Sequence, residues 1–134
     1  LEESTKNDIQ LIEPHDKTKE PVLVIALSTK AILDRIADRF GDTVSLWSIT
    51  CNEPGNDMMR SHRQLKQFNQ VARMAMDAIK TAHSKADCLK IFMAAPASCA
   101  VELGRIRMPK AELPWILYDY WVDKDEDIET ITIK

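Results

Sequence analysis

Apolar runs alternate with amphipathic stretches along most of this chain. Residues 21–27, Pro-Val-Leu-Val-Ile-Ala-Leu, are apolar at every position, which is typical of a strand buried on both faces of a parallel sheet. Between about residues 30 and 40 the apolar side chains recur at helical spacing, and Gly41 follows at the position of a C-terminal cap. The pattern therefore predicts a buried strand followed directly by an amphipathic helix.

The same alternation continues to the end of the chain. It predicts further strands at residues 43–50, 88–93 and 113–120, separated by helices at about 58–82 and 98–107. Residues 128–133 alternate apolar and polar positions, as an antiparallel edge strand does. Because successive parallel strands are joined by right-handed helical crossovers, we expect an α/β fold. Its architecture is a Rossmann-like three-layer αβα sandwich with a mainly parallel central sheet and an antiparallel C-terminal edge strand.

The length of the chain allows one hydrophobic core. With 134 residues, of which 45% are hydrophobic, it can close a single domain. Residues 1–20 are mostly polar and are interpreted as a linker, in which Ile9, Leu11 and Ile12 have the pattern of a short edge strand. We therefore expect the domain to occupy residues 21–134.

Charge and cysteine usage exclude several classes of protein. A net charge of −3 disfavours binding to duplex nucleic acid. The three cysteines, Cys51, Cys88 and Cys99, are odd in number and lack CxxC spacing, which argues against a disulfide framework or zinc site and favours the cytoplasm. No apolar run approaches the roughly 20 residues of a membrane span, so no membrane contact is expected. Neither G-x-G-x-x-G nor Walker A is present, and no cofactor or metal is expected.

The candidate functional residues follow the predicted strands. In a doubly wound sheet, ligands bind beyond the carboxyl ends of the strands, where the strand order reverses. Residues 94–105, beginning Ala-Ala-Pro-Ala-Ser-Cys, lead from a strand into a helix with small side chains, and backbone N–H groups at such a helix start can hold a phosphate. The predicted ligand-binding residues at these strand ends are Ser28, Thr29, Lys30, Thr50, Asn52, Arg60, Ala97, Ser98, Cys99 and Tyr118.

Each of these residues also has an ordinary structural interpretation, which the sequence leaves open. Ser28 and Thr29 have the chemistry of helix caps, and Asn52 that of a turn residue. Tyr118 offers a plane on which a base can stack, but aromatic residues on strands commonly belong to the core. Gly104 in the middle of a helix predicts close packing against a neighbouring element.

Besides ligand binding at the strand ends, the sequence leaves two other classes of function open. An enzyme that cleaves a phosphodiester ligand would use His62 or Lys30, and a nucleophilic Cys99 would need His62 or His83 as its base. No spacing ties these residues to a third, orienting group. The other alternative is a protein-interaction module that pairs with a partner through Trp115 and Trp121.

Two stretches of the sequence resemble the SAVED domain. They are the helix entry at residues 94–104, with Met-Pro-Lys at 108–110, and residues 113–120, Leu-Pro-Trp-Ile-Leu-Tyr-Asp-Tyr. The likeness covers about residues 21–120. SAVED domains are cyclic-oligonucleotide sensors of bacterial antiphage systems of the CBASS type and of some type III CRISPR systems, usually fused to a nuclease, a protease or another effector.

The resemblance implies a specific arrangement and activity. SAVED domains contain two fused Rossmann-like halves related to the CARF fold, and this chain is similar to the carboxyl-terminal half. By this resemblance the chain is a non-catalytic sensor that binds a cyclic oligonucleotide, self-associates on binding it, and activates a fused or partner effector domain.

Overall fold

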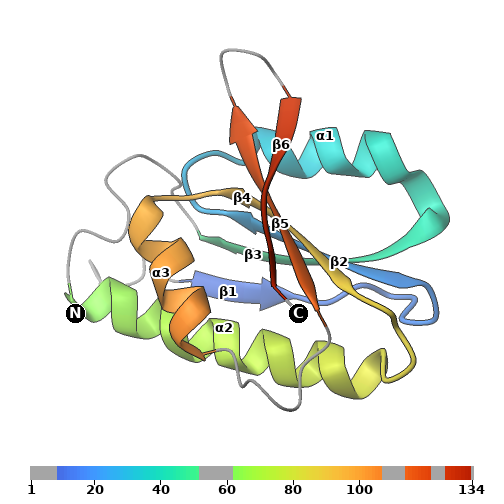
Figure 1. Ribbon diagram of the computed structural model, residues 1–134, viewed down its shortest axis with the longest axis horizontal. Coiled ribbons are helices and arrows are strands. Elements are labelled where there is room, and N and C mark those ends of the chain that lie inside the picture. Colours follow the sequence, from blue (N-terminus) through green and yellow to red (C-terminus); the bar gives the residue numbers. More distant parts are fainter. Residues whose placement is uncertain (1–8, 52–61, 107–113, 122–125, 134) are drawn as a thin grey trace.

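A six-stranded sheet forms the centre of the computed structural model (Figure 1). The structure describes residues 9–51, 62–106, 114–121 and 126–133. The strands are β1 (Ile9–Ile12), β2 (Glu20–Ala26), β3 (Val44–Cys51), β4 (Leu89–Ala94), β5 (Trp115–Trp121) and β6 (Glu126–Ile133). Their order is β1-β3-β2-β4-β5-β6, in which the four central strands are parallel and both edge strands are antiparallel.

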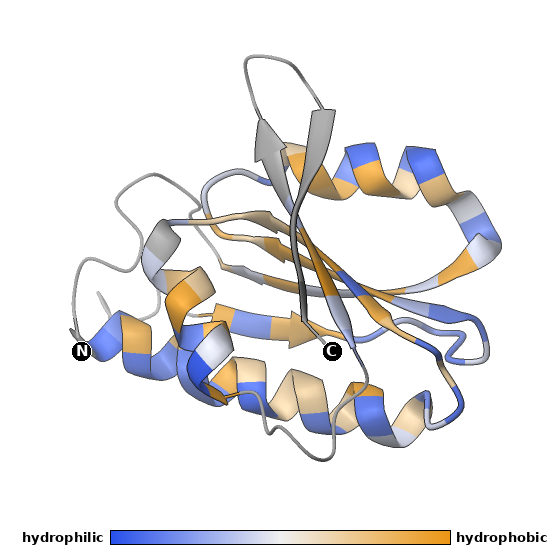
Figure 2. Cartoon of the chain, viewed as in Figure 1, coloured by the Kyte–Doolittle hydropathy of each residue, from blue (hydrophilic) through white to orange (hydrophobic). Residues whose placement is uncertain are grey.

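Helices cover both faces of this sheet. The helices are α1 (Ala31–Phe40), the short 3₁₀ helix η2 (Gly41–Thr43), α2 (His62–Ala82) and α3 (Ala97–Ile106). Helix α1 packs on one face, whereas α2 and α3 pack together on the other (Figure 1). The sheet thus separates two apolar layers, and Figure 2 shows apolar residues along the central strands and alternating apolar and polar residues along α1 and α2.

Strand β2 shows why the chain folds this way. Leu23 and Ile25 lie in the core under α2 and α3, while Val22 and Val24 lie in the core under α1. Each of these side chains is at most 1% exposed. Because alternate residues of a strand point to opposite faces, a strand with helices on both sides needs an apolar residue at every position. The continuous apolar run at residues 21–27 meets this requirement.

The structure confirms the predicted three-layer α/β sandwich with its antiparallel C-terminal edge strand. It also extends the sheet into the segment expected to be a linker. Residues 9–12 form β1, which pairs with β3, and Ile9 is only 5% exposed within the core. The short pattern of Ile9, Leu11 and Ile12 therefore marked a true edge strand. The division into residues 1–20 and 21–134 otherwise stays a prediction.

Two glycines have different roles from each other. Gly41 has a φ of 55° and its N–H donates to the carbonyl of Ala37, which confirms the predicted end of α1. Gly104 is exposed, and a Cβ added to it would meet no atom of the described residues within 4 Å. The prediction of close packing at Gly104 is therefore wrong.

All three cysteines, Cys51, Cys88 and Cys99, are free. Among the described residues, no helix combines the length and the apolar character needed to cross a membrane.

Candidate functional site

The strand order reverses between β2 and β4. After β2 the chain passes through α1 to β3 on one side, and α2 then carries it back past β2 to β4 on the other side. Both α1 and α3 follow carboxyl ends of parallel strands, so both helices begin at the same edge of the sheet (Figure 1). This carboxyl edge, between β2 and β4, is where ligands of such sheets bind.

A single backbone carbonyl ties the two helix entries together. The carbonyl oxygen of Ala94 accepts hydrogen bonds from the N–H groups of Leu27, at 3.0 Å, and Ser28, at 2.7 Å. The segment that enters α1 therefore lies against the segment that enters α3. The structure brings together six of the predicted residues in this way: Ser28, Thr29, Lys30, Ala97, Ser98 and Cys99.

At the entry to α1, the polar side chains differ in how they are used. Thr29 Oγ1 accepts a hydrogen bond from the N–H of Ala31 at 3.1 Å. Its hydroxyl proton can still be donated to a ligand, because a hydroxyl both accepts and donates. Ser28 is half-buried and Lys30 is exposed. The start of α1 thus offers hydroxyl donors and one cation at the same edge, whereas the first-turn N–H groups of Ala31 and Leu33 are already bonded to Thr29 Oγ1 and to the carbonyl of Lys30.

At the entry to α3, Cys99 belongs to the structure of the turn. Its N–H donates to the carbonyl of Pro96 at 2.9 Å, which differs from the expectation that this amide faces a ligand. Its side chain is fully buried, and burial, assisted by the negative charge of Glu102, raises the pKa of the thiol to about 12. The first-turn amides of Ala97 and Ser98 stay the predicted phosphate donors at this entry, and Ser98 is half-buried.

Two predicted residues lie within packed structure. Thr50 is 3% exposed, and its hydroxyl donates to the carbonyl of Cys51 at 3.5 Å. The ring of Tyr118 stacks on Phe92, with 4.5 Å between centroids and 11° between planes. Strand β5 also continues past Tyr118 to Trp121. These positions favour the structural interpretation of both residues, while Asn52 and Arg60 lie outside the described residues.

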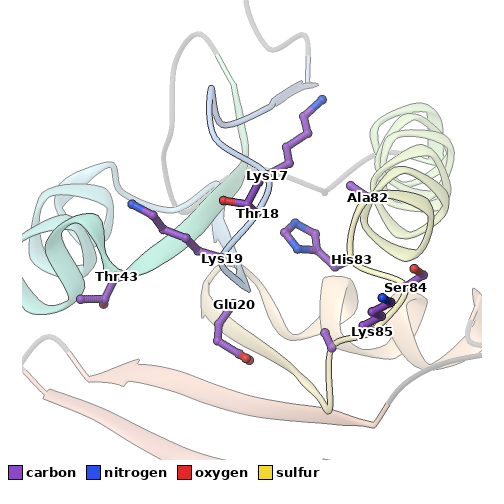
Figure 3. A pocket seen from close by; sticks show the side chains of 10 residues that line it. Lys17, Thr18, Lys19, Glu20, Thr43, Ala82, His83, Ser84 and Lys85 are labelled. Carbon is purple, nitrogen blue, oxygen red and sulfur yellow. The ribbon is translucent and has the colours of Figure 1, made fainter.

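The opposite, amino edge of the sheet contains a polar pocket of about 560 Å³ (Figure 3). His83 lines it and is 6% exposed. Trp47 Nε1–H donates to His83 Nε2 at 3.0 Å, and burial lowers the pKa of the imidazole despite a hydrogen bond with the backbone of Lys19. The N–H of Lys19 in turn donates to Ser45 Oγ at 3.1 Å, and its ammonium group to the carbonyl of Asp42. The polar groups of His83 and Lys19 therefore form hydrogen bonds with other groups of the protein.

The structure argues against residues that the enzyme and the protein-interaction module would each use. His83 lies before β4 and Cys99 after it, and this six-residue strand spans about 20 Å. Together with the raised thiol pKa, this distance rules out a Cys99–His83 catalytic pair. Trp115 is 1% exposed, so it is part of the core and not of an interaction surface. The side chains of His62 and Trp121 lie outside the described set.

A groove between α2 and α3 was missed by the sequence analysis. It has a volume of about 760 Å³. Asn69 Nδ2 donates to Glu102 Oε2 at 2.8 Å, and Arg105 Nη1 to Glu102 Oε1 at 3.3 Å. The available signal was the three-residue spacing of polar residues, which places them on one face of each helix. The groove is lined by Arg63, Leu65, Lys66, Asn69, Glu102 and Arg105.

Comparison with protein families gives one match, which covers residues 2–133. The matching model is SAVED, described as the SMODS-associated and fused to various effectors sensor domain. No curated protein matches the chain.

Solved structures with the same fold include SAVED/CARF-domain containing receptors, named Cap4, from Acinetobacter baumannii. The Cap4 structure with the cyclic trinucleotide 2′3′3′-cAAA has a TM-score of 0.67 and 22% identity, covering 92% of this chain and 26% of that one. The structure with 3′3′3′-cAAA has a TM-score of 0.66 and 19% identity, covering 92% and 27%. A third Cap4 structure has a TM-score of 0.65 and 20% identity, covering 94% and 26%. The chain thus spans about a quarter of the length of these receptors.

Proposed function

The chain belongs to the SAVED family of sensor domains, and from this premise we propose that it binds a cyclic oligonucleotide second messenger at the carboxyl edge of its sheet. The observation that carries the proposal is the shared Ala94 carbonyl, which holds the entries to α1 and α3 against each other. Two solved structures of the same fold contain a cyclic trinucleotide, which supports this class of ligand.

The ligand is held mainly through its phosphates. The first-turn amides of Ala97 and Ser98 and the hydroxyls of Ser28 and Thr29 donate hydrogen bonds, and Lys30 adds a positive charge. Each helix start contributes about 0.3–1 kcal/mol when exposed, so one such contact gives little affinity. A ring with several phosphates engages several donors at once, and the negative charge of the whole chain does not prevent this local attraction.

Binding passes a signal to an effector. We propose that the nucleotide drives self-association of the protein and that assembly activates a linked nuclease or protease in bacterial antiphage defence. The chain supplies one half of a two-lobed module in this proposal, since it spans about a quarter of the Cap4 receptors. The cytoplasmic location expected from the cysteines stays a prediction.

The described residues favour sensing over cleavage. The raised pKa keeps the Cys99 thiol protonated near neutral pH, and the neutral His83 lies at the other edge of the sheet. Among the described residues, no ion pair joins Lys30 to a carboxylate or histidine that could act as a general base. The nucleotide is therefore expected to leave the site chemically unchanged.

Calorimetric titration of the intact protein against a panel of cyclic di-, tri- and tetranucleotides tests this proposal. At least one member is expected to bind with a defined stoichiometry and to be recovered intact by chromatography. Binding to none of the panel rejects the proposed ligand class. Recovery of linear products rejects the sensor in favour of a phosphodiesterase.

A further inference from the structure

Helix α2 lies in a long stretch of sequence without acidic side chains. Residues 58–76 contain no Asp or Glu, although the chain as a whole has 21 acidic and 18 basic residues. The first carboxylate along α2 is Asp77, and the Arg and Lys residues of the helix before it are Arg63, Lys66 and Arg73, which are all exposed. The net charge of −3 therefore averages over a local excess of positive charge.

These three cations lie along one side of α2. Their spacings of three and seven residues place them on the same side of the helix, and Phe68 on the opposite side is buried in the core. At 1.5 Å per residue, Arg63 and Arg73 are about 15 Å apart along the helix axis. Arg105 of α3 lines the same groove as Arg63 and Lys66. We name the surface made of Arg63, Lys66, Arg73 and Arg105 the basic strip.

A hydrogen-bond network between α2 and α3 positions two arginines of the basic strip. Arg73 Nε–H donates to Asn69 Oδ1 at 2.9 Å, and Asn69 Nδ2 donates to Glu102 Oε2 at 2.8 Å. Arg105 Nη1 donates to the other oxygen of the same carboxylate, Glu102 Oε1, at 3.3 Å. A guanidinium group has five N–H donors, so these bonds orient Arg73 and Arg105 and leave each of them donors for a ligand.

The cations of the basic strip are accessible to an anionic partner. Among the described residues, no ion pair joins Arg63 or Lys66 to a carboxylate. Of the described residues that line the groove, only Glu102 is acidic, and both of its oxygens already accept hydrogen bonds. The side chain of Arg105 is 74% exposed despite its bond to Glu102. An anion would therefore meet exposed cations with little competition from carboxylates of the same surface.

We propose that the basic strip binds the phosphate backbone of a single-stranded nucleic acid. Arginine and lysine side chains are the groups with which proteins most often contact backbone phosphates. The strip is long enough for about four nucleotides of a stacked strand, at about 3.4 Å per charge. Its cations form one row beside a groove of about 760 Å³, and a single row fits one backbone, whereas a duplex presents two.

This contact is distinct from the proposed cyclic-nucleotide site. The basic strip lies on the helices that cover one face of the sheet, whereas the paired helix entries lie at the carboxyl edge between β2 and β4 (Figure 1). The described residues that line the groove include no aromatic ring on which a base could stack. We therefore expect binding that depends strongly on salt and little on base sequence.

Fluorescence anisotropy of the intact protein with labelled single-stranded DNA of about 12 nucleotides tests the proposal. The titrations contain EDTA, so that a metal-dependent nuclease in the intact protein leaves the strand uncleaved, and they are repeated between about 50 and 200 mM salt. The test variant carries Arg63→Gln and Lys66→Gln. The matched control carries Lys17→Gln and Lys85→Gln, which remove two exposed lysines at the amino-edge pocket and change the net charge equally.

The test variant is expected to bind the strand at least about 10-fold more weakly than wild type at the lowest salt concentration. Each phosphate contact contributes about −0.7 to the slope of log affinity against log salt for a single strand. Removing two cations should therefore make the slope less steep by about 1.4. The control variant should keep the wild-type slope, and strands of thymidine and of mixed sequence should bind wild type within about 3-fold of each other.

Four results would overturn the inference. Wild-type protein that binds no strand removes it, and an unchanged slope in the test variant, or an equal change in the control, assigns strand binding to another surface or to net charge alone. Tighter binding to a duplex than to a single strand overturns the choice of partner. So does poly-glutamate that displaces the strand as well as unlabelled strand does at equal concentration of charge, because the strip would then favour an acidic peptide.

Calorimetry with the cyclic nucleotides separates this inference from the proposed function. The test variant is expected to bind them within about 2-fold of wild type, and this retained affinity also shows that the variant is folded. A loss of their affinity in the test variant overturns the inference by placing the basic strip in the cyclic-nucleotide site. Wild-type protein that binds the strand but no cyclic nucleotide rejects the proposed function and leaves the strand contact supported.

Discussion

The two edges of the parallel sheet use their polar groups differently. At the amino edge, Trp47 donates to His83, and the backbone and side chain of Lys19 donate to Ser45 and Asp42. At the carboxyl edge, the Ala94 carbonyl holds two helix entries together. The N–H groups of Ala31 and Cys99 are bonded to residues of these entries, whereas the first-turn amides of Ala97 and Ser98 have no acceptor within α3. The polar groups of the amino edge bond to one another, and in the proposed function a ligand bonds to those of the carboxyl edge.

This difference follows from the direction of the strands. Helices begin at the carboxyl edge and end at the amino edge, so the positive ends of their dipoles gather on one side of the sheet. The amino edge contains the carboxyl ends of the helices and the loops that lead back to the strands, and side chains there can form hydrogen bonds with one another. Substitutions at the two edges should therefore separate ligand affinity from stability.

The largest expected effect is on affinity at the carboxyl edge. Ser98→Glu places a carboxylate where a phosphate is proposed to bind, and like charges brought together cost several kcal/mol. We expect the dissociation constant, measured by calorimetry, to rise at least about 100-fold. The melting temperature should change by about 2 °C or less, because an acidic residue in the first helical turn is favourable.

The matched control is Ser84→Glu in the amino-edge pocket. It introduces the same charge at an exposed serine and should leave the affinity unchanged. Equal losses of affinity in the two variants would mean that net charge, and not position, decides binding.

The second effect is on stability at the amino edge. Trp47→Phe removes the donor to His83 and leaves a buried nitrogen without its partner, which costs about 1–3 kcal/mol. We expect the free energy of unfolding from urea denaturation to fall by this amount. Nucleotide affinity should remain unchanged, so a variant that loses affinity but not stability contradicts the assignment of the two edges.

The third effect is a dependence of stability on pH. Burial lowers the pKa of His83 below its usual 6.5, so between the folded and unfolded pKa values the unfolded chain binds more protons. Stability is then complete above about pH 6.5 and decreases as the pH falls below it, with a slope of at most about 1.4 kcal/mol per pH unit.

Denaturation curves between pH 5 and pH 8 measure this slope. His83→Gln should flatten it, whereas His15→Gln, at an exposed histidine, should retain it. A slope that persists in His83→Gln would assign the pH dependence to other groups.

The smallest effect is expected within α3. Gly104→Ala places a methyl group in open space and removes the entropic cost of glycine in a helix, a gain of about 0.5–1 kcal/mol in stability. Because Gly104 lies beyond the first turn of α3, affinity should not change. A loss of stability would show that the exposed face of α3 meets another part of the protein.

The strongest elements of the fold could be predicted from the sequence. Strand β2 has an apolar residue at each position from Pro21 to Ala26, and Gly41 takes the positive φ that a helix end commonly needs. Strand β1 has only four residues, too few for alternation to distinguish an edge strand from a linker. Its burial depends on β3, which lies far along the chain.

The candidate site could be predicted only in part. The small residues at 95–98 and the hydroxyls of Ser28 and Thr29 carry a local signal for helix entry, and the structure brings these segments together. The strand predicted at residues 113–120 ends within one residue of β5, but the stacking of Tyr118 on Phe92 depends on the register of two strands, which the sequence does not give. The groove between α2 and α3 also required tertiary structure, since Arg105 lines it together with Lys66 and Asn69 only through the packing of α3 on α2.

The most direct test of whether the paired helix entries bind the ligand is hydrogen–deuterium exchange. It is measured on the intact protein with and without the tightest-binding cyclic nucleotide of the panel. The account predicts that the nucleotide slows exchange most in peptides covering residues 28–32 and 95–100, with little change at residues 82–88. Protection centred on residues 82–88, or none at the two helix entries, would contradict it.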